Sequence, residues 1–529
     1  MSVMPTNLEK KDNDQLKQSS HSSDNSGKFT KLGTSKSAKS KSSTKSKETI
    51  IEQKSKKYSD KSKKCSDKSK KCSEESIRSS KSGDSLRQPA GKDIHYELTL
   101  REIIPFHIKG TKAKIERKPD KENFCEMINK IATFMKNYME QAGRLPVTSD
   151  SLPGFLYQRL QTHPPAIGVT LDSIMDDVKK LIVPTMTHHK HPRYLASNLL
   201  TRSVPDIVGE LIAVHIGAPG LTYDASPAVA EMQVAMLNWA GRALGIPEKF
   251  LFYANSETSQ GGASFQESIG ESTLCVLMVA RTHSTNQQFI AMSRIQRGEH
   301  YLFAEATAQK FEEHHNIYGR LCVYASSEVH PTLEKQCRLS MMRLRRIQAL
   351  AKNGYGITAH QVKKKIKKDI AMGRIPSCII VTLGTDGVMA NDELGKICRL
   401  GIKYNCWVHV MAHNVSAFWM EPKFRPSSED LIHANSIMGR LPYHANNMVI
   451  VWTRNQNLWK DGFKIFPQYL KPSKSYAIDE RDWAIHLNRR FRGIKVWLNY
   501  RMIGLKRMRE HANQVRQFFE MNILNRFVG

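Results

Sequence analysis

Residues 378–410 read CIIVTLGTDGVMANDELGKICRLGIKYNCWVHV. The stretch opens on Cys378-Ile-Ile-Val-Thr382 and closes on Trp407-Val-His-Val410, two short apolar runs of the kind found in strands buried on both faces. Between them, the pattern around Asp392–Tyr404 predicts a helix. A strand, a helix and a second strand in this order form a βαβ unit. The sequence therefore predicts an α/β fold with a mostly parallel sheet covered by helices.

Further strands and helices extend this pattern toward both ends of the chain. Leu321-Cys-Val-Tyr324 and Met448-Val-Ile-Val-Trp452 are apolar runs that predict two more strands. Ser226 and Pro227 are the residue types of an N-cap and a first helical turn, and they predict a helix that runs to Gly245. An earlier helix is predicted to stop at Gly143. Its apolar positions follow helical spacing: Phe124, Met127, Ile128, Ile131, Phe134, Met135 and Tyr138.

Residues 1–95 form a Lys/Ser-rich segment that is nearly free of large apolar residues. Such a segment buries too little surface to offset the entropy of the chain, so we expect a disordered tail. Within it, Ser59-Asp-Lys-Ser-Lys-Lys-Cys65 repeats directly as Ser66–Cys72, without the apolar stripe of a coiled coil. The repeat is consistent with expansion of low-complexity sequence or with a basic arm that is phosphorylated.

The chain is strongly basic, with a net charge of +30 over 529 residues. Residues 1–100 hold 23 Lys and Arg against 13 Asp and Glu, a net of +10, and the other +20 lies on the rest of the chain. A field of this sign favours polyanions such as nucleic acid, acidic lipid or acidic proteins. A solvated surface without a specific partner has the same composition.

The cysteine pattern and the hydropathy of the chain indicate the cell compartment in which the protein is expected. The nine cysteines are scattered and form no CxxC pair, which favours reduced thiols over a disulfide framework or a zinc site. No apolar run approaches the roughly 20 residues of a membrane-spanning helix, so we expect no membrane span. The first residues lack the apolar core of a signal peptide. We therefore expect the protein in the cytoplasm or the nucleus.

From about Phe124 onward, several segments in order resemble the group II pyridoxal-phosphate decarboxylases, the family of aromatic-amino-acid, tyrosine and histidine decarboxylases. Together these segments cover about three quarters of the chain, and as a set they are specific although each alone is weak. They are Asp176–His188 before His191-Pro192, Ala225-Ser-Pro-Ala228 with Glu231, Ser272-Thr-Leu274 with Ala280-Arg-Thr282, Val381-Thr-Leu-Gly-Thr385, and Arg489-Arg-Phe-Arg492 with Trp497 and Arg501-Met502.

The resemblance implies a fold, a cofactor and an assembly. The fold is that of the pyridoxal-phosphate-dependent transferases (aminotransferase fold type I), and the assembly is a homodimer with active sites at the interface. The expected domains are a tail at 1–95, an N-terminal helical segment at 96–195, a large domain at 196–500 and a remnant helix at 501–529. The family continues into a small C-terminal domain, which we expect to be largely missing here.

The lysine that captures the cofactor aldehyde is the first requirement of this chemistry. The family places it in Pro-His-Lys-Trp, and the matching stretch here is Ala434–His444. An ungapped comparison puts Tyr443 at the lysine, whereas aligning the prolines puts His444 there. Neither is a primary amine, and the next lysine, Lys460, follows the next predicted strand. We therefore expect no catalytic residue at this position.

A carboxylate that keeps the pyridine nitrogen protonated is the second requirement. The family reads His-Val-Asp-Ala-Ala, whereas this chain reads His409-Val-Met-Ala-His413, with Met411 at the aspartate. A thioether carries no charge with which to hold the proton. The resemblance places His413 on the other side of the cofactor ring, where it is not an equivalent acid. The other interpretation is that His413 is simply an imidazole on the surface or in the lining of the pocket.

The phosphate site departs from the family as well. The family's Ser-Ala-Ser corresponds to Ser268-Ile-Gly270, which lacks the second hydroxyl. Leu200 aligns with a family threonine, and a family asparagine becomes Arg440 or Leu441. Arg440 has the chemistry to pair with an anion or to face solvent.

Two cofactor-binding positions keep the family residue type. His330 corresponds to the imidazole that stacks on the ring, and Thr385 to a threonine that contacts the cofactor. With Ser268 and Gly270 they are the vestigial cofactor-binding residues of this chain. The family's mobile loop, which carries a tyrosine that helps to protonate the product, is shorter here. Tyr476 is its one candidate equivalent.

These losses predict a degenerate homologue of aromatic-L-amino-acid decarboxylase, a catalytically inactive scaffold or partner-binding pseudoenzyme whose pyridoxal-phosphate binding is itself in question. It would act as a homodimer, or as a heterodimer with an intact relative. The first alternative is a working carboxy-lyase for an aromatic amino acid, with a lysine supplied from elsewhere. The second is a protein that binds nucleic acid or an acidic partner through its basic tail. No metal site is expected.

Overall fold

A computed structural model describes residues 121–160, 163–194, 202–253, 260–297, 316–444, 448–465 and 478–527 of the chain. The chain divides into two units, Met1–Lys114 and Ile115–Gly529, and all described residues belong to the second. The predicted tail with its heptapeptide repeat, Leu200 and Tyr476 lie outside the described residues.

A seven-stranded sheet in the order β1-β7-β6-β5-β4-β2-β3 forms the centre of the second unit. Strands β3, β2, β4, β5 and β6 pair in parallel, whereas β7 pairs antiparallel with both β6 and β1. The prediction of a mostly parallel α/β sheet is confirmed. The strands are β1 (Gly262–Gln266), β2 (Leu321–Ser326), β3 (Arg343–Ile347), β4 (Ile375–Thr382), β5 (Trp407–Met411), β6 (Ser436–Arg440) and β7 (Val449–Thr453).

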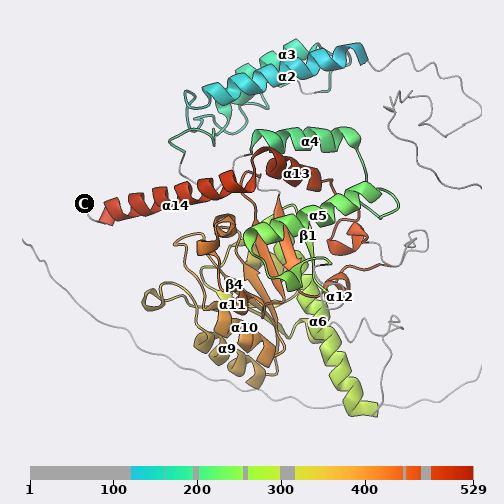
Figure 1. Ribbon diagram of the computed structural model, residues 1–529, viewed down its shortest axis with the longest axis vertical. Coiled ribbons are helices and arrows are strands. Elements are labelled where there is room, and N and C mark those ends of the chain that lie inside the picture. Colours follow the sequence, from blue (N-terminus) through green and yellow to red (C-terminus); the bar gives the residue numbers. More distant parts are fainter. Residues whose placement is uncertain are drawn as a thin grey trace, which may run out of the picture. The chain divides into compact units, whose positions relative to one another are not determined.

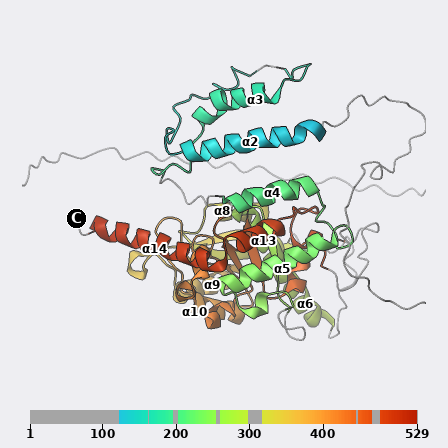
Figure 2. The ribbon, with the colours of Figure 1, turned by 45° about the horizontal axis from the view of Figure 1, so that its top comes forward.

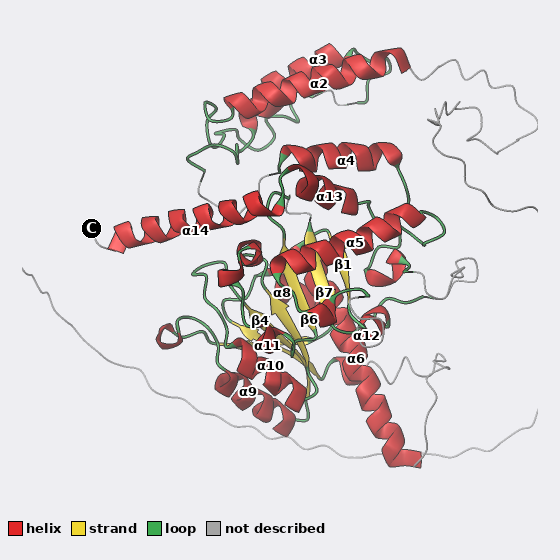
Figure 3. Cartoon of the chain, viewed as in Figure 1, coloured by secondary structure: helices red, strands yellow, loops and turns green. Residues whose placement is uncertain are grey.

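Helices cover both faces of this sheet (Figure 3). The crossover β2-α8-β3 runs outward to the sheet edge and β3-α9-β4 runs back. Because such crossovers are right-handed, α8 and α9 lie on opposite faces. Helix α6 packs against α8, and α10 packs against α9 and α11. These helices are α6 (Ile269–Arg297), α8 (Thr332–Leu339), α9 (Ala359–Ala371), α10 (Leu394–Lys403), α11 (Ser428–Leu431) and α12 (Gln456–Lys460).

Helix α13 (Gly493–Met502) packs against both α4 (Val204–Ile216) and α5 (Pro227–Leu244), which lie on either side of it in Figure 2. Helix α5 begins at the predicted Pro227, and Gly245 ends it in the left-handed conformation, with φ 73°. The predicted helix near Phe124–Tyr138 is α2 (Lys121–Gln141), and its Lys130 pairs with Asp172 of α3 (Leu171–Asp177) at 2.9 Å. The last helix is α14 (Leu505–Phe527), which is labelled near the C-terminus in Figure 1.

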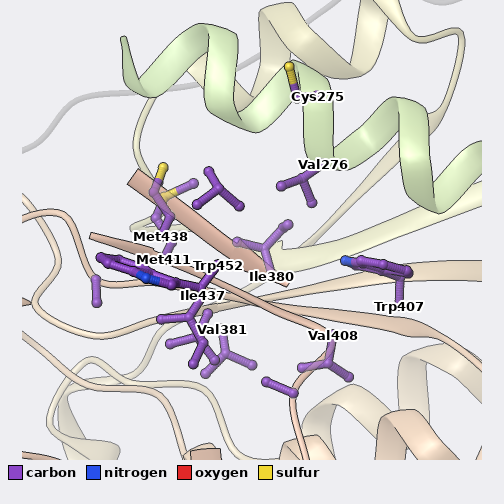
Figure 4. Close-up of a cluster of buried hydrophobic side chains, with 14 of the residues drawn as sticks. Cys275, Val276, Ile380, Val381, Trp407, Val408, Met411, Ile437, Met438 and Trp452 are labelled. Atoms are coloured by element: carbon purple, nitrogen blue, oxygen red, sulfur yellow. The ribbon is translucent and has the colours of Figure 1, made fainter. Parts of the chain in front are cut away.

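The core lies between the central strands and these helices. Trp407, Trp452, Ile437 and Val408 are among its buried side chains (Figure 4). Hydrophobic burial of this extent is the main stabilising term of the fold. The seven cysteines in the described part of the chain are all unpaired, as the sequence predicts. Among the described helices, none is long and apolar enough to span a membrane.

Candidate functional site

The carboxyl ends of β2, β4, β5 and β6 meet at one edge of the sheet, because these strands are parallel neighbours. In open α/β sheets this edge is where ligands bind. The segments that follow β2, β4 and β5 carry His330, Asp386 and His413, and β6 ends on Arg440. The candidate site is built from these four residues and from the start of α6.

His330 and His413 are in direct contact. Their ring centroids lie 5.3 Å apart with the planes at 83°, an edge-to-face arrangement. His330 Nδ1 lies 2.8 Å from the hydroxyl oxygen of Thr332, and burial lowers the pKa of His330. His413 is buried, and its Nδ1 has no hydrogen-bond partner within the described residues. Of the alternatives that the sequence leaves for His413, the surface position is excluded.

Asp386 is the anionic member of the site, and it was not predicted from the sequence. His413 Nε2 lies 3.1 Å from its Oδ1, and Asn414 Nδ2 donates to the same oxygen at 2.7 Å. The hydrogen bond from His413 lowers the pKa of Asp386 to about 2. Asp386 directly follows Thr385 at a strand end, and this position after a parallel strand was the one signal in the sequence that pointed to it.

Arg440, the last residue of β6, is buried rather than solvent-facing. Its Nε donates to the carbonyl oxygen of His413 at 3.0 Å, and an Nη donates to Asn414 Oδ1 at 3.3 Å. Burial lowers the pKa of Arg440, and the charge of Asp386 opposes that shift. The guanidinium is therefore held by protein groups of the site. Leu441, the alternative to Arg440 in the comparison, is buried in the core.

The start of α6 is closed by its own side chains. Ser268 Oγ accepts from the Glu271 backbone N–H at 3.0 Å, and the Glu271 carboxylate accepts from the Glu267 backbone N–H at 2.7 Å. A Cβ on Gly270 would lie 3.1 Å from the side-chain amide of Gln336. A helix N-terminus attracts anions, but here a carboxylate already lies in the first turn.

Thr385 and Met411 both lie beside the site but face the protein. The Thr385 hydroxyl accepts from the backbone N–H of Ala390 at 3.0 Å, and Thr385 is buried. Met411 ends β5 between Thr382 of β4 and Met438 of β6, and its side chain belongs to the hydrophobic core (Figure 4). At this position the chain provides apolar packing and no ionisable group.

The two residues that compete for the lysine position point to different neighbours. Tyr443 has a φ of 66°, and its ring lies 5.0 Å from that of His511 in α14. His444 is buried, and its Nδ1 lies 2.8 Å from Asp206 Oδ1 in α4. Among the described residues, no hydrogen bond or ring contact joins Tyr443 or His444 to His330.

The amines of Lys495 and Lys460 are each held by other groups. Lys495 Nζ, in α13, lies 2.6 Å from Glu210 and 3.4 Å from Asp206. Lys460 Nζ donates to Gln456 at 3.1 Å and lies over the Trp483 ring. Neither Lys495 nor the network around Asp206 was anticipated from the sequence. The long separation along the chain between α4, His444 and α13 explains why.

The chain is similar to proteins of known function. Residues 153–524 match the family described as the pyridoxal-dependent decarboxylase conserved domain. The chain is 29% identical over 413 residues to histidine decarboxylase of Drosophila melanogaster, covering 75% of this chain and 45% of that protein. It is 27% identical over 410 residues to the aromatic-L-amino-acid decarboxylase of the same organism, covering 75% of each.

Solved structures agree with this assignment. A crystal structure of Oryza sativa TDC with PLP and tryptamine has a TM-score of 0.67 and 26% identity, covering 75% of this chain and 77% of that one. The chain thus spans less than half of the histidine decarboxylase that it matches and about three quarters of the other two proteins. The match over most of the chain and the shared fold show that this protein belongs to the group II pyridoxal-phosphate-dependent decarboxylase family.

Proposed function

We propose that this chain is a non-catalytic member of the decarboxylase family, a folded scaffold that works by association with another chain. The observation that carries the proposal is the chemistry at the three required positions. Tyr443 or His444 replaces the lysine, Met411 replaces the carboxylate, and Glu271 lies at the start of α6 where the phosphate would bind. When bound, pyridoxal phosphate supplies an aldehyde and an electron-withdrawing ring.

The residues present do not fit that cofactor. The family places the cofactor ring between His330 and the residue at position 413. A ring stacked between two others needs about 7 Å between the outer planes, and the His330 and His413 centroids are 5.3 Å apart. The space between the His330 and His413 imidazoles is therefore too narrow for the cofactor ring.

A titration with pyridoxal phosphate tests the proposal. We expect the purified chain to show no aldimine absorbance band, no borohydride-reducible adduct at stoichiometric level and no carbon dioxide from labelled aromatic amino acids or histidine. A reducible adduct that maps to one lysine would refute it. Lys495→Met and Lys460→Met variants identify the amine in that case, since Lys495 shares the Asp206 carboxylate with His444.

The proposed association is with a second chain of the same family, a homodimer or a heterodimer with an intact relative. Helix α4 supports it, because Val204, Leu211 and Val214 lie on one side of this helix and are more than half exposed. Exposed apolar side chains gathered on one element are typical of protein interfaces. This face of α4 is therefore the proposed contact.

A second candidate function, binding of nucleic acid, rests on charge in the folded part of the chain. Residues 320–374 hold 13 Lys and Arg against 3 Asp and Glu, a net of +10. Helices α8 and α9 both contact the edge strand β3, so these charges wrap one edge of the sheet. Lys363, Lys364, Lys367 and Lys368 are exposed on α9 in two like-charged i,i+4 pairs, which repel unless an anion lies between them.

Fluorescence anisotropy with duplex DNA and RNA tests this second candidate. Binding through phosphates should weaken steeply between 50 and 200 mM salt, as counterion release requires. A Lys364→Glu/Lys368→Glu variant should bind less than the native chain, whereas Lys403→Glu on α10 should not. Affinity that is independent of salt, or equal in the native chain and the α9 variant, would eliminate this function.

A further inference from the structure

The amino edge of the sheet, opposite the candidate site, carries a set of exposed apolar side chains. Helices α8, α9 and α10 lead into the parallel strands β3, β4 and β5, so the ends of these helices meet at this edge. Each helix end exposes large apolar side chains, with exposed fractions between 45% and 58%. They are Leu339, Met341, Ile370, Met372 and Ile402. One exposed apolar residue needs no explanation, but a set gathered at one edge marks an interaction surface.

The three helix ends lie close together because the strands that follow them are neighbours. Cys322 of β2 pairs with Arg343 at the start of β3, and β4 begins beside β2 at Ile375. Since neighbouring strands are about 4.8 Å apart, β3 and β4 begin about 10 Å apart on either side of β2. Arg320 Nε donates to the Gly373 carbonyl oxygen at 2.9 Å and joins the end of α9 to β2. Helices α9 and α10, labelled side by side in Figure 3, pack together.

Exposed cations lie between these apolar side chains along the chain. Four of them have no ion-pair partner within the described residues: Arg343, Lys367, Lys368 and Lys403. Asp369, the one acidic residue of α9, is buried and already paired with Arg345 at 2.9 Å and with Arg374 at 2.6 Å. It therefore does not offset the exposed lysines. We call the five apolar side chains and these four cations the amino-edge surface, which is both apolar and positively charged.

Met341 is held on this surface in a backbone conformation that disfavours a side chain. Its φ is 60°, whereas the same place after α9 is Gly373, with φ 70°, and after α10 it is Asn405, with φ 51°. The three turns share one backbone hydrogen bond, from the residue after this place to the carbonyl oxygen five residues earlier. Glycine and asparagine are the usual residues there. The backbone therefore does not explain the exposed methionine, and a contact outside the chain would.

We propose that the amino-edge surface binds peripherally to a lipid bilayer that contains anionic lipids. The cations would lie at the headgroups, and the apolar side chains would reach the boundary of the acyl chains. Protein interfaces exclude charged residues from their centre, which does not fit cations that lie between apolar side chains. Nucleic acid is bound through its phosphates and needs no exposed leucine, isoleucine or methionine. This inference goes beyond the proposed function and holds whether or not the chain is catalytic.

Co-sedimentation of the full chain with vesicles tests the proposal. The native chain should bind phosphatidylcholine vesicles that contain about one third phosphatidylserine, and should bind pure phosphatidylcholine much more weakly. Met341→Gly suits the backbone conformation, and Met372→Ser changes an exposed position, so a variant with both changes should fold. It should bind the anionic vesicles about tenfold more weakly, because two apolar side chains are lost. Val388→Ser, 53% exposed at the opposite edge of the sheet, is the matched control and should bind like the native chain.

The basic segment at residues 1–95 is the same in the native chain and the variants, so its attraction to the vesicles cancels in this comparison. Equal vesicle binding by the native chain and the double variant would overturn the proposal, as would a native chain that binds no anionic vesicles. Duplex DNA separates the two polyanions, since the double variant keeps every lysine of α9 and should bind DNA like the native chain. Equal loss of vesicle and DNA binding, at unchanged circular dichroism, would assign the surface to nucleic acid instead. Leu339→Ser repeats the vesicle test at a third exposed position.

Discussion

His444 Nδ1 lies 2.8 Å from Asp206 Oδ1, a contact that ties the segment after β6 to helix α4 across 238 positions of the chain. Lys495 Nζ reaches the same oxygen at 3.4 Å, and all three side chains are buried. Burial opposes ionisation of Asp206, but the hydrogen bond and charge of His444 and the charge of Lys495 hold its pKa below the ordinary value. His444, one of the two candidates for the family's lysine position, thus contributes to the fold.

Asp206→Asn should therefore destabilise the protein although it hardly changes the shape of the side chain. The amide removes the charge that Lys495 and His444 face, but Lys495 keeps its pair with Glu210 at 2.6 Å. We therefore expect a cost of about 1–3 kcal/mol, that of disturbing one buried hydrogen bond. Urea unfolding followed by circular dichroism measures the difference. Asp224→Asn, at an exposed position, is the control. An equal change in the two variants would contradict the role given to the His444–Asp206 contact.

Met411→Asp restores the residue type of the family but should not restore activity. Because Met411 is buried in the core between β4 and β6, a carboxylate there has no charged partner and costs several kcal/mol. Met411→Leu, which conserves volume, should cost less than about 1.5 kcal/mol. Thermal unfolding compares the two. Stability of the aspartate variant equal to that of the leucine variant would show that a cation or an open pocket lies nearby.

Glu480 should make stability depend on pH near neutrality. Burial raises the pKa of Glu480 from its ordinary 4.5 to about 7, and its Oε1 has no hydrogen-bond partner within the described residues. The folded state therefore holds a proton that the unfolded chain releases. The stabilisation of the folded state by this proton is complete below about pH 4.5. It is lost as the pH rises through about 7, and the free energy of unfolding then falls by an amount on the order of 3 kcal/mol.

Urea unfolding of the native chain and of Glu480→Gln between pH 5 and 8 isolates the contribution of Glu480 to stability. The amide cannot ionise, so the native chain should lose stability relative to the variant as pH rises. A stability difference that stays constant over this range would show that Glu480 is ionised in the folded protein.

The exposed face of α4 should govern assembly. Leu211→Glu or Val214→Glu places a charge on this face and should shift the protein from dimer to monomer in light scattering after gel filtration, at unchanged helix content. Ile402→Glu, on the exposed side of α10, is the control. A native chain that is already monomeric, or a dimer that tolerates both α4 variants, would contradict the proposed interface.

The apolar strands could be predicted from sequence because burial on both faces leaves an unbroken run, as in Cys378–Thr382 and Trp407–Val410. β3 was not predicted. Its Arg343-Leu-Arg-Arg-Ile347 sequence belongs to an edge strand, where charged side chains face solvent and prevent pairing with other chains. β1 was missed because Gly262-Ala-Ser-Phe-Gln266 has no apolar run, although all five residues are buried.

Some features of the candidate site could likewise be predicted from the sequence, and others could not. The departures from the family at Met411, at Tyr443 or His444, and at Gly270 can be seen in the sequence, since each is a change of residue type at one motif position. The contacts that fill the site cannot, because they join residues from separate strand ends. The contact between the His330 and His413 rings is one such case. It needs the order of β2, β4 and β5 in the sheet, which no local pattern contains.

The edge-to-face contact of His330 and His413 also bears on the evolution of the site that we propose to be non-catalytic. Under that proposal, a lysine returned after β6 would find no room for the cofactor ring between the two imidazoles, and a smaller residue at position 413 would make room with no amine to capture the aldehyde. Each reversion alone would then bring no benefit, so the proposed function predicts that the ancestral activity does not return by single mutations.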